Sequence, residues 1–365
     1  MIPMVDLKEQ FEEIRDEVME ITESVCNSAK FILGPSVTEL EKKIAGYIDS
    51  GYALGVASGT DALYLSLLAA GIGEGDEVIT TPFTFFATVE AILHCRATPV
   101  FVDIDPNTFN IDVSRMEDAL TKKTRAILPV HLYGYPCNMD ELTALADMRS
   151  IAVIEDAAQA FGAAINGRKA GGFGAAGCFS FYPSKNLGCY GDGGMIVTSD
   201  ADFASTVRLL RNHGSSAGYV HERIGINSRL DELQAAILLV KMKNIERYNE
   251  RRRKNAALYN KLIGSYVQCP GEQNGFRHVF HQYTVRCPKR NNLQEKLKDA
   301  GISSVVYYSV PMHLQKAVGF LGYKKGDFPE AEKAADEVLS LPMYPELGER
   351  DIERICSVIK ESASK

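Results

Sequence analysis

The 365-residue sequence lacks the features of a membrane or secreted protein. It contains no uncharged apolar run of the roughly 18 residues that a membrane-spanning helix needs. Its first residues, MIPMVDLKEQFEE, have neither the basic start nor the apolar core of a signal peptide. We therefore expect a soluble protein located in the cytoplasm.

The sequence also lacks an excess of basic residues. Its formal net charge is -7, whereas binding to nucleic acid requires a clustered basic face. The densest basic run, residues 251–254, follows Glu246 and Glu250 in a helix-like segment. That pattern is typical of a solvated helix face, so no nucleic-acid partner is expected.

Cysteines at metal-ligand spacing are missing as well. The eight cysteines are scattered, with no Cys-x-x-Cys motif and no histidine at ligand spacing. A chain of this length can form its core without disulfides, so we expect reduced thiols and no metal site.

What the sequence does contain is an alternation of short apolar runs with helix-length segments. Its length corresponds to about two domains. Between residues 52 and 199, strand-length runs are bounded by Gly, Pro or Asp, and they read YALGVAS, DEVITT, TPVFVDI, RAILPVH, IAVIED, CFSFY and GMIVTS. The segments between them, such as ATVEAILHC and MDELTALADMR, have helical periodicity. Apolar strands alternating with helices predict an α/β domain with a mostly parallel sheet.

Helical segments flank this region. An opening helix is predicted from an apolar stripe formed by Phe11, Ile14, Val18, Ile21 and Val25. After Asp200 the pattern becomes helical and ends in a long stretch from about 230 to 262. The remainder combines a strand-like HQYTVRC with a helix NLQEKLKDA. We predict a large α/β domain with an N-terminal segment over residues 1–245, and a smaller α+β domain over residues 246–365.

Polar or flexible residues gather just past the ends of four predicted strands, where open α/β sheets bind ligands. The first stretch, VASGTDALYLSLLAAG, places Gly59 and Thr60 before a helix expected to begin near Ala62. Free amides at a helix start beside a glycine suit a phosphate group. Taken alone, however, this stretch favours an ordinary helix cap made by Thr60 or Asp61.

The second stretch, IAVIEDAAQA, ends a strand at Asp156 and continues to Gln159. A carboxylate at a strand end could hold a protonated ring nitrogen. It could equally cap a helix that starts at Ala157, and the sequence leaves both interpretations open.

The third stretch, FSFYPSKNLGCYGDGG, contains one lysine, Lys185, among aromatic residues and glycines. Packing there would partly desolvate the amine, lower its pKa and free it as a nucleophile. The alternative is that Lys185 extends to water from an apolar loop. The glycines that follow favour a backbone kept close to a bound molecule.

The fourth stretch, TPFTFFATVEAI, places Phe83, Phe85 and Phe86 at another strand-to-helix junction. One ring could stack on a flat ligand, and core packing is expected for the other two. Together the four stretches offer a phosphate cradle, an aromatic plate, a strand-end carboxylate and a nucleophilic lysine. Pyridoxal 5'-phosphate (PLP) needs that combination.

Longer motifs carry a family resemblance. SGTDALYLSL, TPFTFFAT, VDIDPNTFNID, VIEDAAQAFGA, SFYPSKNLGCYGDGGMIVTSD and GINSRLDELQAAIL resemble the DegT-type (DegT/DnrJ/StrS) sugar aminotransferases, which are PLP enzymes of fold type I. The resemblance runs from Phe31 to LSLPMYPEL near the C-terminus. It implies an aspartate aminotransferase-like fold with a central, mostly parallel, seven-stranded sheet, and a homodimer with active sites at the subunit interface.

The resemblance also implies the reaction. Such enzymes transfer an amino group from glutamate to a keto group of a nucleotide-linked sugar, in amino-sugar synthesis for cell-surface polysaccharides. One branch replaces the lysine with histidine and performs dehydration, but this chain has Lys185. LGCYGDGG and RIGINSRLDELQAAIL are more similar to members that aminate carbon 3 of 3-keto-6-deoxy sugars or of UDP-2-acetamido-3-keto-glucuronate. The alternatives are amination at carbon 4, amination of a keto-cyclitol, or a non-catalytic PLP-binding regulator.

By the same resemblance, residues of this chain receive roles toward the cofactor. Lys185 forms the Schiff base and shuttles the proton, Asp156 pairs with the ring nitrogen, and Gln159 contacts the ring hydroxyl. The remaining assignments are Gly59, Thr60 and Ser180 to the phosphate, Phe85 to the ring face, and Asn227 to the phosphate of the partner subunit.

Two further residues are assigned to substrate, Arg229 and His313. The alternative to a substrate contact is, for Arg229, an ion pair with Asp231 or Glu232. For His313 it is a loop histidine bonded to backbone.

Overall fold

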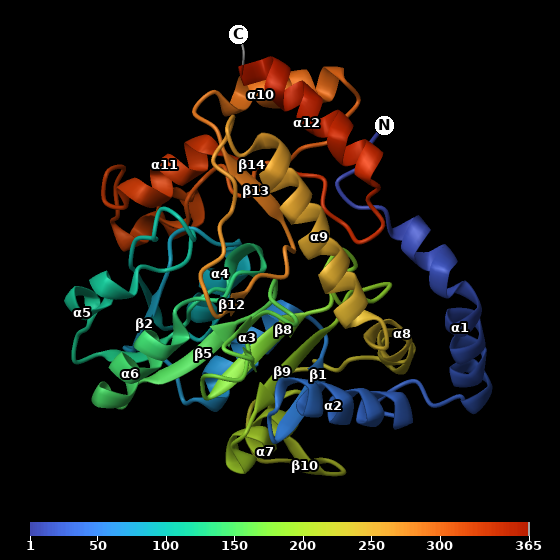
Figure 1. Cartoon of the computed structure of the whole chain (residues 1–365). Helices are drawn as coiled ribbons and strands as arrows, with labels where there is room; N and C mark the ends of the chain where they lie inside the picture. Colours follow the sequence, from blue (N-terminus) through green and yellow to red (C-terminus); the bar gives the residue numbers. More distant parts are fainter. Residues whose placement is uncertain (364–365) are drawn as a thin grey trace.

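A seven-stranded sheet forms the centre of the computed structural model, which describes residues 1–363 (Figure 1). In sheet order the strands are Tyr52–Val56 (β1), Gly194–Thr198 (β9), Ala176–Ser180 (β8), Ala152–Asp156 (β5), Thr124–Ile127 (β4), Glu77–Thr80 (β2) and Thr98–Phe101 (β3). Within this sheet β9 alone runs against the others. Each strand-length run became one of these strands, so the predicted α/β class with a mostly parallel seven-stranded sheet is confirmed.

Helices cover both faces of the sheet because its strands are apolar on both sides. On β2, Val78 and Ile79 enter different cores, and on β5 Ile154 and Val153 divide in the same way, as the two-residue period of a strand requires. One face carries Gly59–Ala69 (α3), Phe86–His94 (α4) and Ala201–Leu210 (α7). The other carries Pro35–Ile48 (α2), Met116–Ala119 (α5), Met139–Arg149 (α6) and Glu232–Met242 (α8).

The predicted opening helix is Leu7–Ser28 (α1). Asp6 caps it by accepting hydrogen bonds from the first-turn amides. Its apolar stripe faces α8, where the buried Ile14 and Val18 pack with Ile237 and Val240. The stripe read from the sequence therefore marks the face that packs.

The C-terminal part of the chain forms a smaller α+β unit, above the sheet in Figure 1. Its strands Tyr283–Arg286 (β13) and Val338–Leu341 (β14) pair antiparallel, and its helices are Ile245–Ile263 (α9), Arg290–Asp299 (α10), Pro329–Glu337 (α11) and Glu349–Ala363 (α12). The strand predicted from HQYTVRC and the helix predicted from NLQEKLKDA are confirmed. The predicted boundary at residue 245 coincides with the start of α9, and the division into two domains stays a prediction.

Two helical predictions after residue 200 are wrong. The long stretch at 230–262 is two helices, because Asn244 (φ -108°, ψ 0°) leaves the helical conformation between α8 and α9; asparagine favours caps and turns over helix interiors. Residues 215–221 form the hairpin Ser215–Ala217 (β10) and Val220–His221 (β11), whose flanking Gly214 and turn Gly218 have positive φ. A further small sheet joins Ala164–Ile165 (β6), Arg168–Lys169 (β7) and Phe276–Arg277 (β12).

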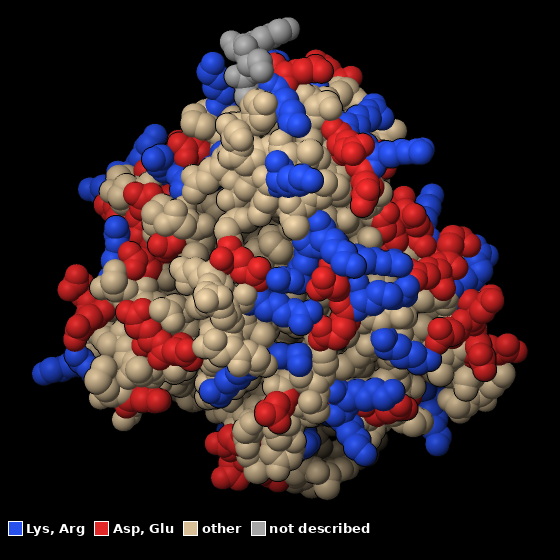
Figure 2. Space-filling view, viewed as in Figure 1, with Lys and Arg blue, Asp and Glu red and all other residues tan. Residues whose placement is uncertain are grey.

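The basic run at 251–254 is a solvated helix face only in part. Arg251 and Arg253 are half-buried and pair with Glu13 and Glu272. Arg252 is 3% exposed and donates to backbone oxygens of the small unit, those of Phe280 and Met343. The prediction of solvation is therefore wrong for Arg252, whose long donor-rich side chain satisfies buried carbonyls. On the face that carries α9, Lys and Arg are interspersed with Asp and Glu (Figure 2).

Three further expectations can be compared with the structure. No helix within residues 1–363 is both long and apolar enough to cross a membrane. All eight cysteines are free thiols. In the same part of the chain, no three His, Cys, Asp or Glu side chains come together in a way that could hold a metal ion.

Candidate active site

The carboxyl ends of β1, β5 and β8 bring most of the predicted site residues to one edge of the sheet. Asp156 ends β5 and Ser180 ends the neighbouring β8. Gly194, at the start of β9, pairs with both Val56 of β1 and Ser180. A Cβ atom on Gly194 would lie 2.3 Å from the backbone oxygen of Ser58. Glycine at this position therefore allows the turn after β1 to approach the end of β8.

The N-terminus of α3 presents free amides beside Ser180. The helix begins at Gly59, and Ser58 caps it by accepting a hydrogen bond from the Asp61 amide at 3.1 Å. The expected cap by Thr60 or Asp61 is therefore wrong, because both already lie in the first turn. The amides of Gly59 and Thr60 have no acceptor within the helix. A Cβ atom on Gly59 would lie 2.7 Å from the Cβ of Ser180, so the two elements are in close contact.

Asp156 is 6% exposed and hydrogen-bonded through both carboxylate oxygens. Its Oδ2 accepts from Thr88 Oγ1 at 2.8 Å, and its Oδ1 accepts from the Ala158 amide at 3.2 Å. Burial raises the pKa of the Asp156 carboxyl, and these two hydrogen bonds oppose that shift. No helix begins at Ala157, where the chain continues in turns. The helix-capping alternative is therefore wrong.

Lys185 lies in a tight loop after β8. Its amide donates to the Tyr182 oxygen at 2.8 Å, and a Cβ atom on Gly188 would lie 2.4 Å from the Pro183 oxygen. The side chain is half-buried, and within residues 1–363 its amine makes no hydrogen bond. Burial lowers the pKa of the Lys185 ammonium to about 8, and the charge of Asp156 opposes the shift. The amine is thus a nucleophile at only mildly alkaline pH.

Gln159 is held from two sides. Its Oε1 accepts from the Tyr133 amide at 2.7 Å, and its Nε2 donates to the Tyr308 hydroxyl at 3.2 Å. The ring of Tyr308 in turn lies 6.1 Å, between centroids, from the ring of Phe85. Gln159 and Phe85 are therefore brought together through Tyr308.

The three phenylalanines of TPFTFFAT occupy different environments. Phe83 is fully buried, and Phe86 packs partly buried against the same core. Phe85, at the start of α4, has 58% of its surface exposed. Phe85 is therefore the ring left free to stack on a flat ligand.

Asn227 and Arg229 lie on the segment that enters α8. Asn227 is exposed and forms an isolated bridge with Asn212. Arg229 Nη1 donates to Asn212 Oδ1 at 2.9 Å. Arg229 pairs with neither Asp231 nor Glu232, because these carboxylates accept backbone amides at the starts of α8 and α2.

Within residues 1–363, the His313 side chain makes no hydrogen bond, ion pair or ring contact with another predicted site residue. It is 2% exposed, its Nε2 lies 3.0 Å from Glu332 Oε1, and its ring packs on Phe328. It is bonded to a side chain and not to backbone, so the alternative considered for it is wrong. A contact between His313 and substrate stays a prediction.

Sequence reasoning missed Thr88 and Tyr308, which support Asp156 and Gln159. Thr88 lies within the aromatic motif, and a hydroxyl on the buried side of α4 was the available signal. Tyr308 is 149 positions from Gln159. No local pattern predicts that contact, which depends on how the small unit folds onto the sheet.

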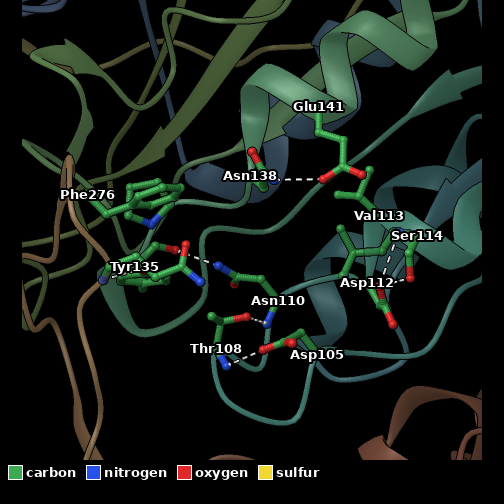
Figure 3. A pocket seen from close by; sticks show the side chains of 13 residues that line it. Asp105, Thr108, Asn110, Asp112, Val113, Ser114, Tyr135, Asn138, Glu141 and Phe276 are labelled. Carbon is green, nitrogen blue, oxygen red and sulfur yellow. Dashed lines mark hydrogen bonds between the residues drawn. The ribbon is translucent and has the colours of Figure 1, made fainter.

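A cavity of about 170 Å³ lies among the loops that follow β3 and precede α6 (Figure 3). Neither Lys185 nor Asp156 lines it. Its acidic side chains each accept a hydrogen bond from a neighbour, in the pairs Asp105 with Thr108, Asp112 with Ser114, and Glu141 with Asn138. With its carboxylates already engaged, this cavity adds nothing to the chemistry described above.

Known proteins match the chain over almost its whole length. The sequence profile of the DegT/DnrJ/EryC1/StrS aminotransferase family matches residues 12–360. A protein of Geobacillus stearothermophilus named pleiotropic regulatory protein is 52% identical over 99% of this chain and 98% of its own length. The UDP-N-acetyl-3-dehydro-alpha-D-glucosamine 3-aminotransferase of Acidithiobacillus ferrooxidans is 48% identical, over 99% of this chain and 98% of its own.

Solved structures agree with this match. DesV of S. venezuelae has a TM-score of 0.98 and 41% identity, covering 100% of this chain and 99% of its own. NtdA of Bacillus subtilis, with bound cofactor PMP, has a TM-score of 0.91 and 31% identity, covering 97% and 82%. The fold described above is thus the fold of these proteins.

Proposed function

Because this chain belongs to the DegT/DnrJ/EryC1/StrS aminotransferase family, whose cofactor is PLP, we propose that it aminates carbon 3 of a nucleotide-linked 3-keto sugar with glutamate as amino donor. The observation that carries the choice of substrate is the near-full-length similarity to the Acidithiobacillus 3-aminotransferase. The proposed substrates are 3-keto-6-deoxy sugars and UDP-linked 2-acetamido-3-keto sugars such as the glucuronate.

The residues at the sheet edge suit PLP. The half-buried amine of Lys185 has no hydrogen-bond partner in residues 1–363, and a Cβ atom on Gly59 would fill the narrow space beside Ser180. The first amides of α3 are free to hold a phosphate. We assign Gly59, Thr60 and Ser180 to the phosphate, Phe85 to the ring face, Asp156 to the ring nitrogen, Gln159 to the ring hydroxyl and Lys185 to the aldehyde carbon.

The chain's own residues would direct the reaction. When bound, PLP supplies an aldehyde that takes up the amino group and a ring that delocalises electrons. The Asp156 carboxylate would hold a proton on the ring nitrogen, because a buried anion favours the cationic form of its partner. Lys185 Nζ would carry the proton between cofactor carbon and substrate carbon, and a pKa of about 8 suits both the uptake and the return of that proton.

We further propose a homodimer in which Asn227 completes the site of the partner subunit. The Asn227 side chain is exposed and makes no hydrogen bond within residues 1–363. Mixing the inactive variants Lys185→Ala and Asn227→Ala tests the idea, since a hybrid dimer then has one site with both native residues. Activity should return on mixing under conditions that exchange subunits. No recovery in verified hybrid dimers would place Asn227 outside the partner's site.

The spectrum of the purified holoenzyme with and without glutamate tests the amino donor. Glutamate should shift the near-visible cofactor band to shorter wavelength. The loaded enzyme should then aminate a 3-keto nucleotide sugar, detected by mass spectrometry, faster than 4-keto sugars or a free keto-cyclitol. Preference for a 4-keto sugar or the cyclitol would overturn the substrate proposal and leave the aminotransferase assignment intact.

A non-catalytic regulator is the second candidate, and the name of the Geobacillus relative is the observation that favours it. A regulator predicts a cofactor band that glutamate does not change. The presence of Lys185, Asp156 and Gln159 together favours catalysis, because a carboxylate that keeps the ring nitrogen protonated serves electron withdrawal, which binding alone does not require.

A further inference from the structure

Three buried oxygen-bearing side chains form a row behind the candidate site. Thr84 Oγ1 lies 2.8 Å from Thr88 Oγ1, which lies 2.8 Å from Asp156 Oδ2. Thr84 is 1% exposed, Thr88 is fully buried and Asp156 is 6% exposed. Thr88 lies in the first turn of α4, and Thr84 lies in the bend just before the N-cap residue of that helix, Phe85. Bulk water is therefore absent from the row, and its members depend on one another for hydrogen bonds.

The charge of Asp156 fixes the direction of these hydrogen bonds. An ionised carboxylate only accepts, so the Thr88 hydroxyl must donate its one proton to Asp156. The Thr88 oxygen is then left to accept from Thr84. Both donors point toward the carboxylate, which is the arrangement that stabilises a negative charge there.

Within the described part of the chain, no other side chain donates a hydrogen bond to the Asp156 carboxylate. Within residues 1–363, the remaining hydrogen bond to the Asp156 carboxylate comes from the Ala158 amide, on Oδ1. Lys185 and His131 act on Asp156 only through space, and Tyr308 and Cys178 are the other titratable groups that sense it. Oδ2 thus owes its orientation to Thr88.

We infer that Thr88, backed by Thr84, is a positioning residue that keeps the Asp156 carboxylate ionised and turned toward the ring nitrogen of PLP. This rests on the proposed assignment of Asp156 to that nitrogen. Loss of the Thr88 hydroxyl should leave Asp156 free to rotate and to bind a proton itself. The ring nitrogen would then lose part of its positive charge.

The test compares Thr88→Val, Thr88→Ser and Thr80→Val. Valine keeps the shape of threonine without the hydroxyl, and serine keeps the hydroxyl. Thr80 is a matched control, because it is also fully buried and its Oγ1 also donates a hydrogen bond of 2.8 Å. Its acceptor, however, is the backbone oxygen of Leu128, the residue that follows β4. Thermal unfolding of the apoproteins reports how far each substitution lowers the stability of the fold.

The decisive readout is the ring-nitrogen signal of bound ¹⁵N-labelled PLP, with equilibrium affinity for PLP measured alongside. Thr88→Val should move that signal toward its position in Asp156→Asn and weaken PLP binding by at most about a hundredfold, the upper limit for a lost hydrogen bond to a charged group, because this bond is already made in the apoprotein. Thr88→Ser and Thr80→Val should leave both near wild type. Thr84→Val should have a smaller effect on both measurements in the same direction. It takes the place of Thr88→Val in the test if Thr88→Val does not fold.

The outcomes separate the two assignments. If Asp156→Asn moves the signal and neither Thr88→Val nor Thr84→Val does, the role of Thr88 is refuted and that of Asp156 stands. If Asp156→Asn leaves the signal unchanged, the assignment of Asp156 itself fails. If Thr88→Ser behaves like Thr88→Val, the effect is not carried by the hydroxyl and the inference is wrong.

Discussion

Replacing Gly59 with alanine would test the proposed phosphate site at its narrowest point. The added Cβ would lie 2.7 Å from Ser180 Cβ and 3.2 Å from both Ser180 Cα and Oγ. Carbon atoms in contact are normally about 3.5–4.0 Å apart. Because the closest atoms belong to the root of the Ser180 side chain and its backbone, rotating that side chain cannot relieve the overlap. The start of α3 must therefore move away from the end of β8.

The expected magnitude combines opposing effects. Alanine in a helix is favoured over glycine by about 0.5–1 kcal/mol, whereas overpacking a close contact costs about 1–3 kcal/mol. We expect the free energy of unfolding of the apoprotein to fall by about 1–2 kcal/mol. Displacing the first amides of α3 should cost a further hydrogen bond to a charged group, which corresponds to about tenfold to a hundredfold weaker PLP binding.

The assay compares PLP with pyridoxal, which has the same ring and aldehyde but no phosphate. Gly59→Ala should weaken the binding of PLP and leave that of pyridoxal nearly unchanged. Gly46→Ala is the matched control: Gly46 also lies in a helix, α2, and a Cβ there would meet no atom within 4 Å. Equal weakening of PLP and pyridoxal by Gly59→Ala, or no weakening of either, would refute the placement of the phosphate at α3.

Three other predictions concern the lysine and a buried carboxylate. Lys185→Ala should abolish transamination while circular dichroism remains that of the native fold; a near-normal rate would refute its catalytic role. The rate at which the apoprotein binds PLP should rise with pH around 8, because the amine of Lys185 reacts only when unprotonated; a flat profile from acid to alkaline pH in stopped-flow absorbance would contradict this. The buried Glu155 accepts hydrogen bonds from His131 and three backbone amides. Glu155→Gln should therefore lower the free energy of unfolding, measured by urea titration, by about 3 kcal/mol. A loss below about 1 kcal/mol would show that an amide side chain satisfies the same donors.

The strands, and the sheet edge at which Asp156 and Ser180 meet, could be predicted from the sequence because both depend on local composition. Runs such as IAVIED are apolar throughout, so they had to lie between two helical layers, and parallel order then placed Asp156 and Ser180 at one edge. Phe83 and Phe86 entered the core as expected. What the sequence could not fix was the position of single hydrogen bonds. Ser58, Thr60 and Asp61 are all good caps, and their order along the chain does not reveal which of them is used.

Contacts between distant segments were the other limit. Tyr308 reaches Gln159, Arg252 reaches backbone oxygens of the small unit, and His313 pairs with Glu332. The contact of Tyr308 with Gln159 depends on how the C-terminal unit packs on the sheet, whereas the other two join segments within that unit. A single sequence carries no periodicity across such separations. The expectation of a solvated Arg252 was wrong because this side chain is buried. The expectation of a backbone-bonded His313 was wrong because its partner is a side chain.

The shifted pKa values of Lys185 and Asp156 also bear on why the cofactor should bind tightly. Burial lowers the pKa of the lysine to about 8 from 10.5 and raises that of the aspartic acid. In both cases the charged form is disfavoured in the folded apoprotein relative to the unfolded chain.

For Lys185 the unfolded chain binds more protons between pH 8 and 10.5. The loss of stability caused by burying its charge is therefore full below pH 8 and disappears as the pH rises through that window. For Asp156 the folded state binds more protons, so its penalty grows as the pH rises above the unfolded value. In the folded apoprotein the charged forms of both groups are therefore disfavoured by burial, and their opposite charges only partly compensate for it. A ligand that consumes the charge of the amine and offers a ring cation to the carboxylate removes both penalties, and any ligand that binds only the folded state stabilises it. The same burial that destabilises the apoprotein thus increases its affinity for a molecule with an aldehyde and a basic ring nitrogen.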